Sequence, residues 1–137
     1  MSSLPSPAPG LVIRFAYLWH RQAIEHRQEA EKDRPCLILL HEDGKRTYVC
    51  PITHAPPLQP EAAIEIPARV KAHLGLDDAP SWVIVSECNS FDWPGFDLRR
   101  TADGDVAYGM IPPRLYDRIR EAALRLIRAH SFSNISR

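Results

Sequence analysis

The sequence has no net charge and no long apolar run. Its 17 lysines and arginines balance 17 aspartates and glutamates, so no overall basic field favours nucleic acid, although a local basic patch is compatible with neutrality. No uninterrupted apolar stretch approaches the roughly 18 residues of a membrane span, and the N-terminus has neither the basic nor the apolar region of a secretory signal. We therefore expect no membrane association and a cytoplasmic location.

Motifs for metal binding, nucleotide binding and nucleophilic catalysis are also missing. The sequence contains no H-E-x-x-H, no zinc-finger spacing, no Walker A loop, no G-x-G-x-x-G and no G-x-S-x-G. Cysteine occurs only at Cys36, Cys50 and Cys88, an odd number without C-x-x-C spacing. We expect these to be reduced, buried thiols, and we expect neither a metal site nor a cofactor.

Proline, by contrast, occurs thirteen times. Residues 1–9 have a proline at almost every second position and are expected to form a disordered or extended lead. Residues 10–137 are enough for one domain with its own core. Because the other prolines are scattered between short apolar runs, the pattern favours a mainly β domain with helices, of the α+β class.

The central feature is a predicted β-hairpin. Two apolar, β-favouring runs, Arg34–Leu40 and Thr47–His54, are separated by a short polar segment containing Asp43-Gly44. Asp-Gly is a strong hairpin signal because glycine tolerates the positive φ of a tight turn. The hairpin would bring Arg34 and Thr53 to the same end, so that a fixed cation lies near a hydroxyl.

Other elements follow from local patterns. Strands are expected at residues 11–19, 63–67, 81–86 and 106–111. A short helix is expected over residues 67–74, with Gly75 as its terminator. The charged segment 20–33 lacks an apolar stripe, so it is either a solvated helix or a mobile loop.

An amphipathic helix is predicted at the C-terminal end. Pro112 and Pro113 favour a helix start, and apolar residues then recur every three or four positions through Ile127. The opposite face carries five arginines against two acidic residues: Arg114, Arg118, Arg120, Arg125 and Arg128 against Asp117 and Glu121. This face either only solvates the helix or contacts nucleic acid.

The residues at the end of the hairpin are suited to phosphate chemistry. Arginine is permanently charged and bidentate, and threonine adds a donor to the same phosphate oxygens, so Arg34 and Thr53 could stabilise a reacting phosphate. His54 is adjacent, and Glu87 and Asn89 follow the predicted strand 81–86. RNA supplies its own 2′-hydroxyl nucleophile, so cleavage would need only a base, an acid and charge stabilisation.

Structural roles for the same residues remain open. Arg34 could pair with a carboxylate such as Glu29, and Thr53 could satisfy a turn. Trp93 lies in an aromatic, turn-rich loop around Pro94-Gly95. Its ring could stack on a base or simply cover the core.

Several short segments, taken in order, resemble the MazF/PemK family of toxin–antitoxin toxins. They are Gly10–Ile13, Glu29, Arg34-Pro35, Pro51-Ile52-Thr53, Leu74-Gly75-Leu76, Ser81–Val85 and Tyr108–Pro112 before the terminal helix. The resemblance implies an SH3-like small β-barrel with a C-terminal helix, usually a homodimer. It also implies a metal-independent endoribonuclease that acts on single-stranded RNA and is neutralised by a cognate antitoxin. The family's catalytic pair falls on Arg34 and Thr53.

The chain departs from the family pattern beside this pair. His54 replaces a small residue, and Ser86-Glu87-Cys88-Asn89 replaces the segment where many members carry Asp-Gln and then Arg. We expect Glu87 to join Arg34 and Thr53 as a catalytic residue, with His54 as an alternative base. His54, Asn89 and Trp93 are expected to contact RNA. The alternative is a catalytically impaired barrel that works as a protein-binding module or poisons a protein target such as gyrase.

Overall fold

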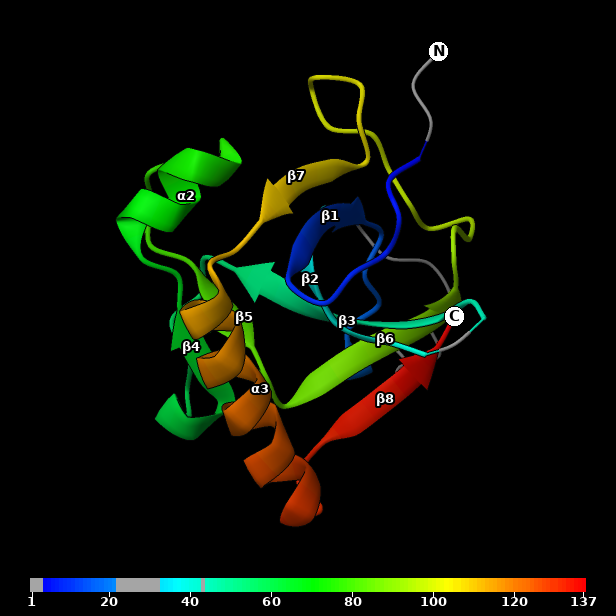
Figure 1. Cartoon of the computed structure of the whole chain (residues 1–137). Coiled ribbons are helices and arrows are strands. Elements are labelled where there is room, and N and C mark those ends of the chain that lie inside the picture. The colour runs from blue at the N-terminus through cyan, green and yellow to red at the C-terminus, as the bar shows by residue number, and fades with distance from the viewer. Residues whose placement is uncertain (1–3, 22–32, 43) are drawn as a thin grey trace.

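The computed structural model describes residues 4–21, 33–42 and 44–137, which form an eight-stranded sheet and two α-helices (Figure 1). The elements are β1 Leu11–Phe15, β2 Arg34–His41, β3 Arg46–Thr53, the 3-10 turn η1 Pro60–Ala62, β4 Ala63–Glu65, α2 Ala68–Leu74, β5 Trp82–Ile84, β6 Glu87–Asp92, β7 Ala107–Met110, α3 Pro113–Arg128 and β8 Ser133–Ser136. The predicted α+β class is confirmed.

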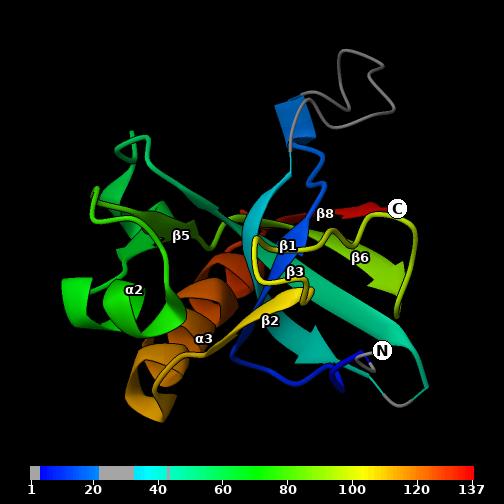
Figure 2. The same ribbon diagram turned by 90° about the horizontal axis from the view of Figure 1, so that it is seen from above.

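The predicted hairpin is present as β2 and β3. The two strands are antiparallel, with Leu37 opposite Cys50, and an irregularity shifts the register between Ile38 and Leu40. The hairpin extends away from α2 and α3, which lie together on the other side of the molecule (Figures 1 and 2).

Strand β3 is the point at which the sheet divides. Its first half pairs with β6 and its last two residues, Ile52 and Thr53, pair with β5. The main strand order is β4-β5-β3-β2-β1-β7, and all these pairings are antiparallel. Among the described strands, no hydrogen bonds join β4 to β7. The sheet is therefore open, and the closed barrel that the resemblance implies is not seen.

Two strands were not predicted, β6 and β8. β6 occupies residues expected to form a strand exit and a loop, because its sequence, Glu-Cys-Asn-Ser-Phe-Asp, has no apolar alternation. Its Asn89 and Ser90 are nevertheless fully buried. β8 runs parallel to β6, and the Arg137 side chain anchors it through two contacts of 3.1 Å with the Asp97 carboxylate. Tertiary pairing, not local propensity, makes these segments strands.

Strand β1 is shorter than predicted. The strand was expected to reach Trp19 but ends at Phe15. The Tyr17 amide donates to the Phe15 carbonyl oxygen at 3.0 Å, and this tight turn ends the ladder. As a result, Tyr17 and Trp19 leave the sheet and reach the end of the hairpin.

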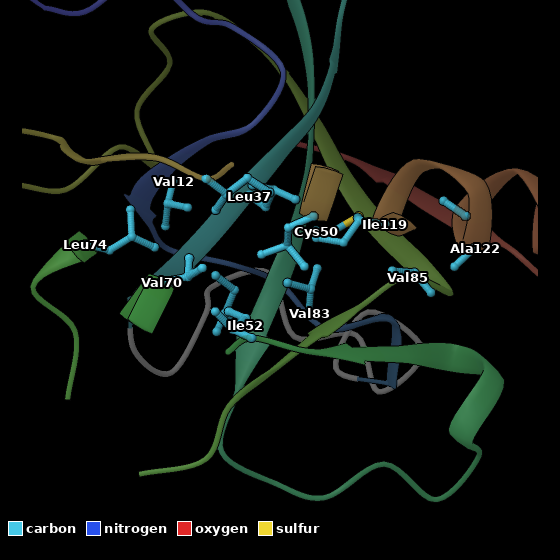
Figure 3. Packing of buried hydrophobic residues seen from close by; sticks show 14 of the residues in the cluster. Val12, Leu37, Cys50, Ile52, Val70, Leu74, Val83, Val85, Ile119 and Ala122 are labelled. Carbon is cyan, nitrogen blue, oxygen red and sulfur yellow. The ribbon is translucent and has the colours of Figure 1, made fainter. Parts of the chain in front are cut away.

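The two helices and the sheet enclose the larger core cluster (Figure 3). Helix α3 contributes Leu115, Ile119, Ala122 and Ala123 and leaves its arginines exposed, which confirms the predicted amphipathic pattern. Helix α2 contributes Val70 and Leu74 and ends at Gly75, whose φ of 72° suits glycine.

The N-terminal lead is only partly described. Residues 4–8 have no regular structure, whereas the Gly10 amide donates to the Ile38 carbonyl oxygen at 2.9 Å and so holds the start of β1 against β2. Residues 1–3, and most of the charged segment 20–33, lie outside the described residues. Among the described helices, none has the length and apolar character to cross a membrane.

The three cysteines are free and buried, as predicted. Burial, with a smaller effect of the nearby Glu87 carboxylate, raises the pKa of Cys88 to about 12. Burial also raises the pKa of Cys36 and of Cys50. Because the thiolate is the reactive form, we expect no alkylation of the native protein by iodoacetamide at pH 8 and full alkylation in denaturant, measured by mass spectrometry. Rapid labelling of the native protein would contradict this.

Candidate functional site

The open end of the hairpin carries Arg34 and Thr53, here called the hairpin pair. Cys36 lies opposite Pro51, so continuing the antiparallel register by two residues brings Arg34 and Thr53 to the same end of the ladder. Both residues line each of two cavities. The hairpin pair therefore stands at the boundary between the cavities.

The two cavities differ in chemistry. The larger has a volume of about 610 Å3 and is lined by Trp19, Leu58 and Glu87, among others; we call it the Trp19 cavity. The smaller has a volume of about 360 Å3 and is lined by Arg14 and Tyr108, among others; we call it the Tyr108 cavity. Both walls are more apolar than polar, but the Trp19 cavity is the more apolar of the two, and charged and hydroxyl side chains make up a larger share of the Tyr108 cavity.

Arg34 is a cation held in place without a carboxylate partner among the described residues. Its guanidinium carbon lies 4.9 Å from the centre of the Trp19 ring, a cation–π contact that orients the group without neutralising it. Its Nε is buried and has no hydrogen-bond partner within the described part of the chain. The proposed partner Glu29 lies outside the described residues. A fixed cation that lines two cavities and has no carboxylate partner among the described residues is suited to an anionic ligand.

Thr53 is oriented by its own turn. Its Oγ1 accepts a hydrogen bond from the Ala55 amide at 3.1 Å. The hydroxyl proton is therefore available for a second interaction, and a phosphate oxygen is a suitable acceptor. Thr53 therefore satisfies a turn, as one of the two alternatives predicted, and this hydrogen bond is compatible with ligand binding.

Glu87 enters the site from the start of β6. Its Oε1 accepts hydrogen bonds from the Tyr17 hydroxyl at 3.0 Å and the His20 amide at 3.1 Å. Oε2 has no partner among the described residues, so it can accept a proton. Burial and the adjacent Glu87 carboxylate raise the pKa of Tyr17 well above its usual range, so Tyr17 remains a donor. The structure thus brings Glu87 to the same cavity as the hairpin pair.

Asn89, predicted to contact substrate, instead holds the backbone of a segment that lines the site. The residue is fully buried. Its Oδ1 accepts from the Leu18 amide and its Nδ2 donates to the Leu18 carbonyl oxygen, both at 2.8 Å. This bidentate contact fixes the segment that carries Tyr17 and Trp19, and leaves no surface of Asn89 for a ligand.

His54 lines the Tyr108 cavity, but its ring is engaged with the protein. Its Nε2 lies 2.9 Å from Asp77 Oδ2, and its Nδ1 lies 3.1 Å from both the Ser81 hydroxyl and the Pro80 carbonyl oxygen. Asp77 also pairs with the buried Lys71 at 2.7 Å, an interaction that lowers the pKa of the Asp77 carboxyl. His54 is therefore better suited to form the cavity wall than to act as a base.

Trp93 is not brought to the hairpin pair. Its amide donates to the Lys45 carbonyl oxygen at 2.8 Å, beside the hairpin turn, and its ring packs against Phe91 with centroids 6.1 Å apart. Thr53 is at the other end of β3, roughly 25 Å away at about 3.3 Å per residue. The structure therefore fits the alternative in which the Trp93 ring covers the core.

Sequence reasoning missed Arg14, Asp33 and Tyr108 in the smaller cavity. The Arg14 Nε donates to the Asp33 carboxylate, and its Nη1 donates to the Tyr108 hydroxyl at 2.8 Å. The Arg14 hydrogen bond lowers the pKa of Asp33. Asp33 immediately precedes Arg34 and both line this cavity, so we expect the contact with Arg14 to keep the Asp33 carboxylate from pairing with the Arg34 guanidinium. No local pattern joins residues so distant in the sequence.

The arrangement combines a fixed cation, a hydroxyl donor and a carboxylate around one cavity. Such a set can hold a phosphodiester, stabilise added negative charge on it and remove a proton beside it. Within the described part of the chain, no group of three or more histidine, cysteine, aspartate or glutamate side chains is placed to hold a metal ion.

Comparisons with known proteins place the chain in a family. The model of the family described as "PemK-like, MazF-like toxin of type II toxin-antitoxin system" matches residues 17–123. Similar solved structures include the Mycobacterium tuberculosis toxin MazF-mt6, with 22% identity, a TM-score of 0.56, and coverage of 85% of this chain and 95% of that one. A MazE-MazF crystal structure from Deinococcus radiodurans has 19% identity, a TM-score of 0.57, and coverage of 89% and 96%.

These two structures are similar in fold. A search of curated proteins found no significant match. The family model spans most of the chain, including the hairpin pair and Glu87. The chain therefore belongs to the PemK-like, MazF-like toxins of type II toxin–antitoxin systems.

Proposed function

We propose that this protein is an endoribonuclease toxin that cleaves single-stranded RNA with the substrate's own 2′-hydroxyl. The observation that carries the proposal is the meeting of Arg34, Thr53 and Glu87 at one cavity, with the Arg34 Nε buried and unpartnered among the described residues. Family membership supports the same reaction class.

In the proposed reaction Glu87 Oε2 takes the proton from the 2′-hydroxyl, and the 2′-oxygen attacks the phosphorus. The bond from phosphorus to the 5′-oxygen breaks, leaving a 2′,3′-cyclic phosphate on one fragment. The departing 5′-oxygen takes a proton from water. The permanently charged guanidinium of Arg34 stabilises the charge that develops on the phosphate, while the Thr53 hydroxyl donates to the same oxygens.

The proposal is tested by incubating the purified protein with a long single-stranded RNA in excess EDTA. We expect cleavage, because neither the proposed nucleophile nor the proposed base requires a metal. An Arg34→Ala, Thr53→Ala double variant provides the control for contaminating nucleases. Absence of cleavage, together with growth arrest that persists in the double variant, would instead favour the protein-binding alternative.

We also propose that a cognate antitoxin neutralises the protein, that it acts as a homodimer, and that it works in the cytoplasm without a cofactor. The Deinococcus radiodurans relative is a MazE-MazF structure, and it motivates the antitoxin. Light scattering tests the dimer, since the expected mass is twice the 15.5 kDa of one chain.

Arg14 is predicted to assist Arg34 by holding Asp33. Replacing Arg14 by methionine frees the Asp33 carboxylate to pair with Arg34, and we expect RNA cleavage to fall by about tenfold. Adding Asp33→Asn should recover most of the activity, because the competing charge is removed. Single-turnover rates of the wild type, both single variants and the double variant measure this coupling. Absence of recovery would show that Arg14 acts by another route.

A further inference from the structure

The two cavities that share the hairpin pair define a direction for the substrate. Arg34 and Thr53 line both cavities, whereas Glu87 lines only the Trp19 cavity and Tyr108 lines only the Tyr108 cavity. A phosphate held by the hairpin pair therefore has one neighbouring nucleotide on each side. Only one of these nucleotides can be close to the carboxylate.

Chemistry decides which nucleotide that is. The reacting 2′-hydroxyl belongs to the nucleotide on the 5′ side of the scissile phosphate, and a general base must come within hydrogen-bonding reach of it. We propose, resting on the proposed function, that this 5′ nucleotide occupies the Trp19 cavity and the 3′ nucleotide, which carries the leaving oxygen, occupies the Tyr108 cavity.

The walls of the Trp19 cavity agree with this orientation. Its volume of about 610 Å3 is bounded by Trp19, Pro57, Leu58 and Ile84, with Arg21 and Gln59 as additional polar side chains. Apolar and aromatic walls suit the faces of a nucleobase, and the Gln59 amide or the Arg21 guanidinium can hydrogen-bond its edge. This cavity is therefore where the base on the 5′ side is selected.

The Tyr108 cavity offers different contacts. Its volume of about 360 Å3 is lined by Arg14, Lys71 and Tyr108, whose hydroxyl already accepts a hydrogen bond from Arg14. Charged and hydroxyl groups suit the sugar, the following phosphate and the polar edge of the 3′ base. Substitutions here should change selection on the 3′ side only.

Cleavage of an RNA pool with random sequence, read by sequencing the cut ends, tests the orientation. Gln59→Ala should change the relative use of the four bases on the 5′ side of the cut by about threefold or more, the effect of one hydrogen bond, and leave the 3′ side unchanged. Tyr108→Phe is the matched variant in the other cavity and should change only the 3′ side. The reversed pattern, or no change with either variant, would overturn the proposed orientation.

A crosslinking measurement separates the orientation from activity. A non-cleavable RNA with one deoxyribose at the reacting position would carry 4-thiouridine on either its 5′ or its 3′ side. The 5′ probe should crosslink to residues 55–59 and the 3′ probe to the region of Tyr108, as mapped by mass spectrometry; exchanged products would overturn the orientation. If the wild-type protein cleaves no RNA at all, the proposed function itself fails, which is a distinct result.

Discussion

Replacing Arg34 by alanine is expected to lower the single-turnover rate of RNA cleavage by a factor of about 10² to 10³, the usual effect of removing one transition-state donor. The guanidinium lies over the Trp19 ring, with its Nε buried and unpartnered among the described residues. Because Arg34 also lines both cavities, we expect the exposed part of its guanidinium to contact the substrate.

Two further variants sharpen this prediction. Arg34→Lys keeps the charge but loses the planar fork, so an intermediate rate is expected. Arg118→Ala removes a charge from the exposed face of α3 and serves as the matched control, with little change in rate. If Arg34→Ala and Arg118→Ala lower the cleavage rate equally, the rate depends on the total positive charge of the protein and not on the position of Arg34. An unchanged rate in Arg34→Ala would remove Arg34 from the reaction.

Asn89→Ala is expected to lower the free energy of unfolding by about 2 to 4 kcal/mol. The substitution leaves the buried amide and carbonyl of Leu18 without the partners that Asn89 supplies at 2.8 Å, and each unsatisfied buried group costs about 1 to 3 kcal/mol. Urea denaturation measures the change. Gln59→Ala removes an exposed amide that makes no side-chain capping hydrogen bond; it is the control and should change stability by less than about 0.5 kcal/mol.

The same variant separates two roles for Asn89. If Asn89 only supports the segment that carries Trp19, cleavage should fall together with stability. If the Asn89→Ala protein is stable but binds RNA more weakly, the result would instead support the direct contact between Asn89 and substrate that was predicted from the sequence.

Elements with strong local signals could be predicted. The β2–β3 hairpin, the stop of α2 at Gly75 and the amphipathic stripe of α3 each depend on residues close together in the chain. β6 and β8 could not be predicted, because their polar side chains are buried or paired only through partners elsewhere, such as Leu18 for Asn89.

The same limit applies to the site: residues placed by local patterns could be predicted, and those placed by distant contacts could not. Antiparallel register follows from a hairpin, so the meeting of Arg34 and Thr53 could be inferred from sequence, and the exit of a neighbouring strand indicated Glu87. The contribution of Trp19 depends on a tight turn after Phe15, and that of Arg14 on an ion pair with Asp33. Neither contact has a local sequence signal.

The most direct test of the central claim uses an RNA in which one cleaved position carries 2′-deoxyribose. If the substrate's 2′-hydroxyl is the nucleophile at the site formed by Arg34, Thr53 and Glu87, cleavage at that position should be abolished. The all-ribose RNA should yield a 2′,3′-cyclic phosphate and a 5′-hydroxyl. Continued cleavage at the deoxyribose position, or products with 5′-phosphate ends, would contradict the proposed chemistry.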